Sequence, residues 1–256
     1  MTQLRYSICL DSCCPKKDYA VALEEVKAAG FEYYEFWGGM NKDLKSIKAK
    51  ADSLGLKIAH FGSRKTPGTL VNASDHDSFV NDMPEVIEAA KFMGINRMVT
   101  TAGNDNGMRR DFQHNNIVTV LKRVMPILEQ NNFILDLEPL NGRKNHVGTF
   151  LESSDEAFAI CDEVGSPNMR LLFDIYHQQI TEGDILHRMI PRIKQIGHVH
   201  CAGSDNRNEL DLGELNHRYI FKALAEAGYD GIVGLEYFPI GDSLTGLKRM
   251  YEYLHK

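Results

Sequence analysis

The chain has 256 residues, of which 43% are hydrophobic and 25% are charged, and its formal net charge at pH 7 is −6. This composition is ordinary for a globular protein with one barrel-sized domain or two small ones. The longest basic cluster is Arg109–Arg110. Nucleic acid is therefore a poor candidate partner, because phosphate backbones are bound by clustered positive charge.

The chain shows no sign of a membrane segment or of secretion. No stretch approaches the roughly 18 uninterrupted apolar residues of a membrane-spanning helix. The start, MTQLRYSICLDSCC, has no basic region followed by a long apolar run, so a secretory signal is not expected. The five cysteines are odd in number and lack zinc-ribbon spacing, which favours reduced thiols. We expect a cytoplasmic protein with no membrane partner.

Short apolar runs alternate along the chain with longer amphipathic stretches, which is the pattern of βα units and a parallel sheet. The predicted strands are Arg5–Leu10, Tyr33–Trp37, Lys57–Gly62, Arg97–Thr101, Phe133–Glu138, Met169–Asp174, Gln195–His200 and Gly231–Glu236. The predicted helices are Tyr19–Ala29, Leu44–Leu54, Ser78–Met93, Ile117–Gln130, Asp155–Val164, Asp184–Ile190, His217–Ala227 and Leu244–His255. Eight strands, each followed by a helix, predict a single-domain α/β fold over residues 1–256, the (β/α)₈ or TIM barrel.

Local signals agree with this fold. Ser153 stands three residues before Glu156, which predicts a capping box at the start of a helix. The competing α/β fold, an open doubly wound sheet, would have a glycine-rich turn after the first strand, but the residues there read DSCCPKK. Glycines follow four of the predicted helices, as helix C-caps prefer, at Gly30, Gly55, Gly94 and Gly228.

Four consecutive predicted strands end on charged or imidazole side chains: Glu138, Asp174, His200 and Glu236. Any one of them alone is more often a capping or hydrogen-bonded group. Together they lie at equivalent positions where a barrel places its active site, and burying such charges is costly unless they bind a cation. We therefore expect one divalent metal ion. Carboxylates with one imidazole suit Mn²⁺ or Mg²⁺ best and also admit Co²⁺ or Zn²⁺.

Two glutamates near one metal also fit a specific reaction. Moving a proton between adjacent carbons of a small hydroxy-carbonyl compound requires a base at one carbon and an acid at the next. The enediolate formed between the two steps is stabilised by a divalent cation. The sequence thus predicts Glu138 and Glu236 as the catalytic acid–base pair of a metal-dependent isomerase or epimerase.

Four motifs carry a family resemblance. The segments LEPLN (137–141), FDIYHQQ (173–179), GHVH (197–200) and GLEYFP (234–239) resemble the hydroxypyruvate isomerase family, within the xylose isomerase-like barrels that also include the ketose 3-epimerases. The resemblance implies interconversion of hydroxypyruvate, or a close 2-oxo acid, with 2-hydroxy-3-oxopropanoate. It implies the same four metal ligands, substrate contacts by His177 and Arg207, and association into a homo-oligomer. An arginine suits the substrate carboxylate, because its planar fork binds both oxygens.

The chain departs from that family where substrate would be bound. Many hydroxypyruvate isomerases have glutamine at the position of His200, while the epimerases have histidine. The loop around Arg207 reads SDNRNEL and the turn after the fifth strand reads HVGTF, and neither matches the family's usual pattern. The substrate class stays open at this point, with a ketose 3-epimerase or another sugar isomerase as the alternative.

Two functions of other classes fit less well. An apurinic-site endonuclease shares this barrel but needs a three-zinc cluster with more ligands and a basic face. A non-catalytic binding protein would have little reason to keep four metal-binding side chains at strand ends.

Several further side chains have weaker expectations attached. Trp37 could form a wall of the pocket, and His60 could contact substrate. By strand alternation, Asp136 and His198 point inward with Glu138 and His200, and we expect them to form a buried polar layer beneath the metal. Four histidines fall in helical or surface segments and are expected to be solvated: His114, His187, His217 and His255.

Overall fold

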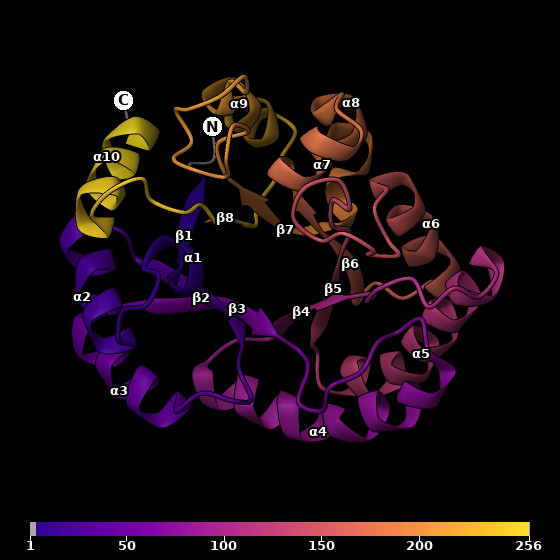
Figure 1. Cartoon of the computed structure of the whole chain (residues 1–256). Coiled ribbons are helices and arrows are strands. Elements are labelled where there is room, and N and C mark those ends of the chain that lie inside the picture. Colours follow the sequence, from indigo (N-terminus) through magenta and orange to yellow (C-terminus); the bar gives the residue numbers. More distant parts are fainter. Residues whose placement is uncertain (1–3, 256) are drawn as a thin grey trace.

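A computed structural model describes residues 4–255, which form a closed barrel of eight parallel strands surrounded by helices (Figure 1). Each strand pairs with the next along the chain, and β8 pairs with β1 to close the barrel. The strands are β1 (Arg5–Cys9), β2 (Tyr33–Gly38), β3 (Lys57–Gly62), β4 (Arg97–Thr101), β5 (Ile134–Glu138), β6 (Met169–Asp174), β7 (Ile196–Cys201) and β8 (Ile232–Leu235). The predicted (β/α)₈ barrel is confirmed.

The longer helices form a ring outside the strands (Figure 1). They are α2 (Tyr19–Ala29), α3 (Leu44–Leu54), α4 (His76–Met93), α5 (Arg110–Gln130), α6 (Ser154–Val164), α9 (His217–Glu226) and α10 (Ser243–His255). Shorter helical turns are α1 (Leu10–Cys13), α7 (Ile175–Thr181), α8 (Ile185–Met189) and the 3₁₀ segments η1 (Ala73–Asp75) and η2 (Ile190–Gln195). The sequence did not predict α1 and α7, because each is only one or two turns long and begins directly at a strand end.

Capping residues that the sequence predicted lie at helix ends. The Ser153 side chain accepts a hydrogen bond from the backbone N–H of Glu156 at the start of α6. Gly30, Gly55 and Gly94 have the left-handed backbone conformation that ends α2, α3 and α4. Within residues 4–255, no helix is long and apolar enough to cross a membrane. All five cysteines are buried and free.

The lower part of the barrel interior holds a buried ion pair rather than an apolar layer. Arg97 Nε on β4 lies 2.8 Å from Asp136 Oδ2 on β5, and the Asp136 side chain is 1% exposed. Gly197 on β7 provides the room, since a Cβ there would lie 1.9 Å from Asp136 Oδ1. Asp136 and His198 are both buried as expected, but they have different partners: Asp136 pairs with Arg97, and His198 faces Glu35.

The expectation that His217 is solvated was wrong. Its side chain is fully buried at the start of α9, where Nδ1 lies 2.9 Å from the carbonyl oxygen of Leu210. The amphipathic pattern placed it on a surface helix correctly, but its first turn packs under the loop that follows β7. His187 and His255 are exposed, and His114 lies between two carboxylates of α6.

We expect Arg97→Met to destabilise the fold by about 3–5 kcal/mol, because it leaves the Asp136 carboxylate buried without its counter-charge. Chemical denaturation measures the effect. The double variant Arg97→Met/Asp136→Leu should recover most of the loss, since it removes both charges. Arg123→Met, which breaks an exposed pair with Asp77, is the control and should cost less than about 1 kcal/mol. A small effect of Arg97→Met would show that the buried pair contributes little.

Candidate active site

A cavity of about 310 Å³ opens where the strands end at their carboxyl side. Such a position is where barrels of this type bind their ligands. The residues around it come from distant parts of the chain and include Trp37, Glu138, His177, His200, Arg207 and Glu236.

Three carboxylates meet at the floor of this cavity. Glu138 ends β5, Asp174 ends β6, and Glu236 follows β8 directly. Together with His177 of α7, each offers a ligand atom within 4.8 Å of the others, and all four residues are buried. Parallel pairing from β5 to β8 brings these positions to one level, which is why charges far apart in the sequence converge.

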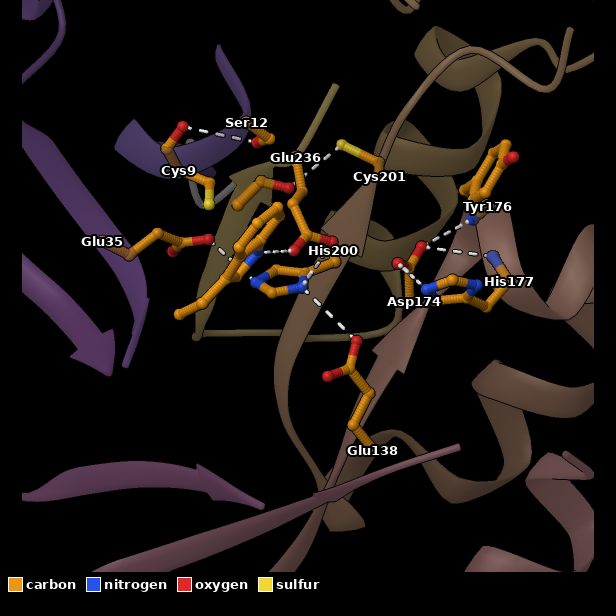
Figure 2. A network of polar contacts seen from close by, with 12 residues as sticks. Cys9, Ser12, Glu35, Glu138, Asp174, Tyr176, His177, His200, Cys201 and Glu236 are labelled. Atoms are coloured by element: carbon orange, nitrogen blue, oxygen red, sulfur yellow. Dashed lines mark hydrogen bonds and ion pairs between the residues drawn. The ribbon is translucent and has the colours of Figure 1, made fainter. Parts of the chain in front are cut away.

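Asp174 has a second role that fixes its orientation. One carboxylate oxygen, Oδ1, accepts hydrogen bonds from the backbone N–H groups of Tyr176 (2.8 Å) and His177 (3.3 Å), and so caps α7. The other oxygen, Oδ2, is left to face the cavity, with His177 Nε2 3.4 Å away. The same cap therefore aims both Asp174 and His177 into the site (Figure 2).

His200 presents its two ring nitrogens to different carboxylates. Nδ1 lies 3.6 Å from Glu138 Oε1 and 3.3 Å from Glu236 Oε2, while Nε2 lies 2.8 Å from Glu35 Oε1 on β2. Figure 2 shows the ring between Glu35 on one side and the cavity carboxylates on the other. Gly234 on β8 makes space for this arrangement, because a Cβ there would lie 2.3 Å from Glu35 Oε1.

Arg207 lies directly beside the carboxylates of Glu236 and Asp174. Its Nη2 donates to Glu236 Oε2 and is 3.7 Å from Asp174 Oδ2. The guanidinium also lies against the rings of Tyr176 and Phe238. Arg207 has a positive φ of 59°, which is uncommon for a residue with a Cβ, and its carbonyl accepts a hydrogen bond from Phe238 N–H.

The charges of these groups depend on one another. Burial would raise the pKa of Glu236, but Arg207 and His200 outweigh it and hold that pKa well below its usual range. Burial raises the pKa of Asp174, and Arg207 only partly opposes this. Burial and the nearby Arg207 lower the pKa of His177 to about 3, so its imidazole is neutral at physiological pH.

The donor set fits a divalent cation. Three carboxylates and imidazole nitrogens are the mixed oxygen and nitrogen ligands that Mn²⁺, Co²⁺ or Zn²⁺ accept. The carboxylates of Glu236 and Glu35 outweigh burial and raise the pKa of His200, so a bound cation would take the place of a ring proton there. Two ring nitrogens that face this space, His200 Nδ1 and His177 Nε2, are buried and have no hydrogen-bond partner among the described residues. Buried polar atoms are normally satisfied, so their lone pairs suit a metal.

The structure brings together every site residue that the sequence suggested. Glu138, Asp174 and Glu236 come together with His177. His200 Nδ1 lies 3.6 Å from Glu138 Oε1 and 3.3 Å from Glu236 Oε2, and Arg207 pairs with Glu236.

Two further side chains were suggested as pocket residues, and a buried acid next to His200 was missed. Trp37 and His60 line the cavity, and Trp37 Nε1 donates a hydrogen bond to Glu236 Oε1. Sequence reasoning did not single out Glu35, although an acid in the middle of the aromatic strand YYEFW was the available signal.

Comparison with known proteins agrees with this geometry. A family model described as the xylose isomerase-like TIM barrel matches residues 23–254. A putative hydroxypyruvate isomerase of Mus musculus is 34% identical over 243 residues, which cover 88% of this chain and 86% of that protein. A 2-oxo-tetronate isomerase of Cupriavidus necator is 43% identical over 118 residues, 46% of this chain and 45% of that protein.

A solved structure with lower sequence identity has the same fold. A crystal structure from Brucella melitensis, described as an AP endonuclease of family 2, superimposes with a TM-score of 0.91. It covers 98% of this chain and 99% of that chain at 24% identity, which shows the fold alone.

We expect Asp174→Asn to weaken Mn²⁺ binding by about 100-fold or more, because even the partners of metal ligands contribute 10–100-fold. Titration followed by the electron paramagnetic resonance signal of free Mn²⁺ measures the affinity. Asp77→Asn, which changes an exposed carboxylate on α4, should bind like the wild type. Equal affinity of Asp174→Asn and the wild type would exclude Asp174 as a ligand.

Proposed function

This chain belongs to the hydroxypyruvate isomerase and 2-oxo-tetronate isomerase family of the xylose isomerase-like TIM barrels, and on that premise we propose that it is a metal-dependent isomerase of hydroxypyruvate or a close 2-oxo acid. The product from hydroxypyruvate is 2-hydroxy-3-oxopropanoate. The observation that carries the proposal is the convergence of the Glu138, Asp174 and Glu236 carboxylates, with His200 Nδ1 beside them, at the cavity that Arg207 also lines.

The reaction needs one proton transfer at each of two neighbouring carbons. In the forward direction, one glutamate carboxylate removes a proton from C3, and the C–H electron pair forms the C2–C3 double bond of an enediolate. The proton of the C3 hydroxyl is transferred to the C2 oxygen, and the other glutamate, which is protonated at the start, delivers its proton to C2. Proton exchange with water then returns both carboxyl groups to their starting states. The C3 oxygen is then an aldehyde. Glu138 and Glu236 are the pair we assign, because both line the cavity.

The surrounding side chains prepare Glu236 for this role. Trp37 Nε1 donates to one of its carboxylate oxygens and Arg207 Nη2 to the other, so the group is oriented and ionised. The four proposed ligands Glu138, Asp174, His200 and Glu236 would hold one divalent cation. When bound, it would supply positive charge that stabilises the negative oxygens of the enediolate.

Arg207 and His177 are the proposed substrate-binding residues. The guanidinium lies at the cavity wall with Tyr176 and Phe238 on its flanks, which leaves its planar edge for a carboxylate. A bound 2-oxo acid would share Arg207 with Glu236. His177 is neutral, and its Nε2, which makes no hydrogen bond among the described residues, suits a hydrogen bond to a hydroxyl or carbonyl oxygen of the substrate.

Hydroxypyruvate incubated in D₂O with the metal-loaded enzyme should give 2-hydroxy-3-oxopropanoate in an NMR assay, and chelation should stop the reaction. Glu138→Gln and Glu236→Gln should each lower kcat by about 10²–10⁴-fold while keeping the fold, because glutamine cannot transfer the proton. Glu163→Gln, on the exposed side of α6, is the control. Deuterium exchange or epimerisation at C3 of a ketose, with no turnover of hydroxypyruvate, would move the assignment to the ketose 3-epimerases.

Arg207 distinguishes the substrate classes further. Arg207→Met should raise the KM for hydroxypyruvate roughly 10- to 100-fold, since a charged hydrogen-bonded contact to its carboxylate is lost. The KM of any uncharged ketose that turns over should change much less. Steady-state kinetics of both substrates measure this, and Arg207→Lys serves as the variant that keeps the charge. An equal effect on both substrates contradicts a carboxylate-binding role.

A further inference from the structure

A second cluster of potential ligands lies beneath the cavity floor. It consists of Glu35 on β2, His60 on β3, and His198 and His200 on β7, and each of these residues is at most 3% exposed. His200 is the only residue that belongs both to this deep cluster and to the proposed metal site above it. Its Nε2 faces Glu35 of the deep cluster, while its Nδ1 faces the cavity. The proposed reaction uses none of Glu35, His60 or His198.

The donor atoms of the deep cluster are spaced like the corners of a metal coordination shell. His60 Nε2 lies 3.2 Å from His200 Nε2 and 3.4 Å from Glu35 Oε2. Glu35 Oε2 lies 3.1 Å from His198 Nε2, and Glu35 Oε1 lies 2.8 Å from His200 Nε2. Ligands of a tetrahedral zinc ion at 2.0–2.1 Å are about 3.3 Å apart, so small adjustments would accommodate one.

Hydrogen bonding within the cluster does not satisfy these atoms. Ser7 Oγ donates to Glu35 Oε2, but the close contacts of Glu35 Oε1 with His200 Nε2 and of His198 Nε2 with Glu35 Oε2 lack hydrogen-bond geometry, so among residues 4–255 neither Glu35 Oε1 nor His198 Nε2 makes a hydrogen bond despite its burial. His60 Nε2 and His200 Nε2 face each other, and only one of these nitrogens can carry the proton between them. Buried polar atoms without partners are rare in native proteins, and a bound ion is one recognised explanation.

We propose that Glu35, His60, His198 and Nε2 of His200 form a second divalent-cation site of the zinc type. Three imidazoles and one carboxylate make a nitrogen-rich set, which favours Zn²⁺ or Co²⁺ over Mg²⁺. The upper site is rich in oxygen and favours harder ions. His200 would then bridge the two sites as an imidazolate, with a lone pair of each ring nitrogen on one ion and its ring protons released to solvent when both ions bind. A route for the ion exists, because His60 and His200 both line the cavity.

The test is metal stoichiometry, which does not depend on the substrate of the proposed isomerase. The full-length protein is stripped with a chelator and titrated with Co²⁺, while bound metal is counted by mass spectrometry and visible absorption is recorded. Four-coordinate Co²⁺ absorbs far more strongly than six-coordinate Co²⁺. We expect the wild type to bind two equivalents and to show the intense bands.

Variants separate the two sites. Asp174→Asn impairs the upper site and should keep one equivalent with the intense bands. His60→Phe preserves ring shape but removes both nitrogens, and it should keep one equivalent with weak bands only. His76→Phe is the matched control, because His76 is a buried histidine on α4 whose Nε2 contacts the Leu70 carbonyl instead. It should bind two equivalents.

The proposal is overturned if the wild type binds a single equivalent that His60→Phe leaves unchanged, or if Asp174→Asn binds no Co²⁺ at all. Either result would make the deep cluster a hydrogen-bonded support for His200. If His60→Phe fails to fold, the number of Co²⁺ equivalents bound by the wild type and the absorption spectrum of Asp174→Asn still decide whether the second site exists. A wild-type protein that binds two equivalents of Co²⁺ but does not isomerise hydroxypyruvate would contradict the proposed function and still support the second metal site.

Discussion

Carboxylates buried at the end of a parallel barrel need positive charge close by, and the region around the cavity is organised by that requirement. Glu138, Asp174 and Glu236 converge because parallel strands bring their ends to one level, and all three side chains are buried. An isolated buried carboxylate would be strongly destabilising or protonated. Arg207 and His200 supply part of the compensation, and they keep Glu236 ionised.

The same requirement explains the unusual backbone of Arg207. A positive φ is costly for a side chain with a Cβ, and such strain persists only where the surrounding contacts hold it. Here the contacts are the Glu236 carboxylate, the flanking rings of Tyr176 and Phe238, and a backbone hydrogen bond from Phe238. The guanidinium therefore lies beside the cavity carboxylates, and a substrate with its own carboxylate could take over part of this ion pairing.

Much of the fold and of the upper site was predictable because both follow from periodic or local rules. The spacing of the predicted strands indicated a barrel. Because the active site of such a barrel lies at the carboxyl ends of its strands, Glu138 and Asp174 could be predicted as site residues. Glu35 was missed because its one local signal, an acid within the aromatic strand YYEFW, does not reveal that its partners come from β3 and β7. The burial of His217 likewise depends on a loop whose path the sequence does not reveal.

His200 shows where residue identity is insufficient and geometry decides. A strand-end histidine predicts one metal ligand, but an imidazole has nitrogens on two edges, and which edge faces which partner depends on tertiary structure. Gly234 clears space for Glu35 next to the ring, so Nε2 is directed at Glu35 while Nδ1 is left for the cavity. One rigid ring is thereby fixed by both clusters at once. A change in the deep cluster would be felt at the cavity through the orientation of this ring, even where the altered side chain never touches the substrate.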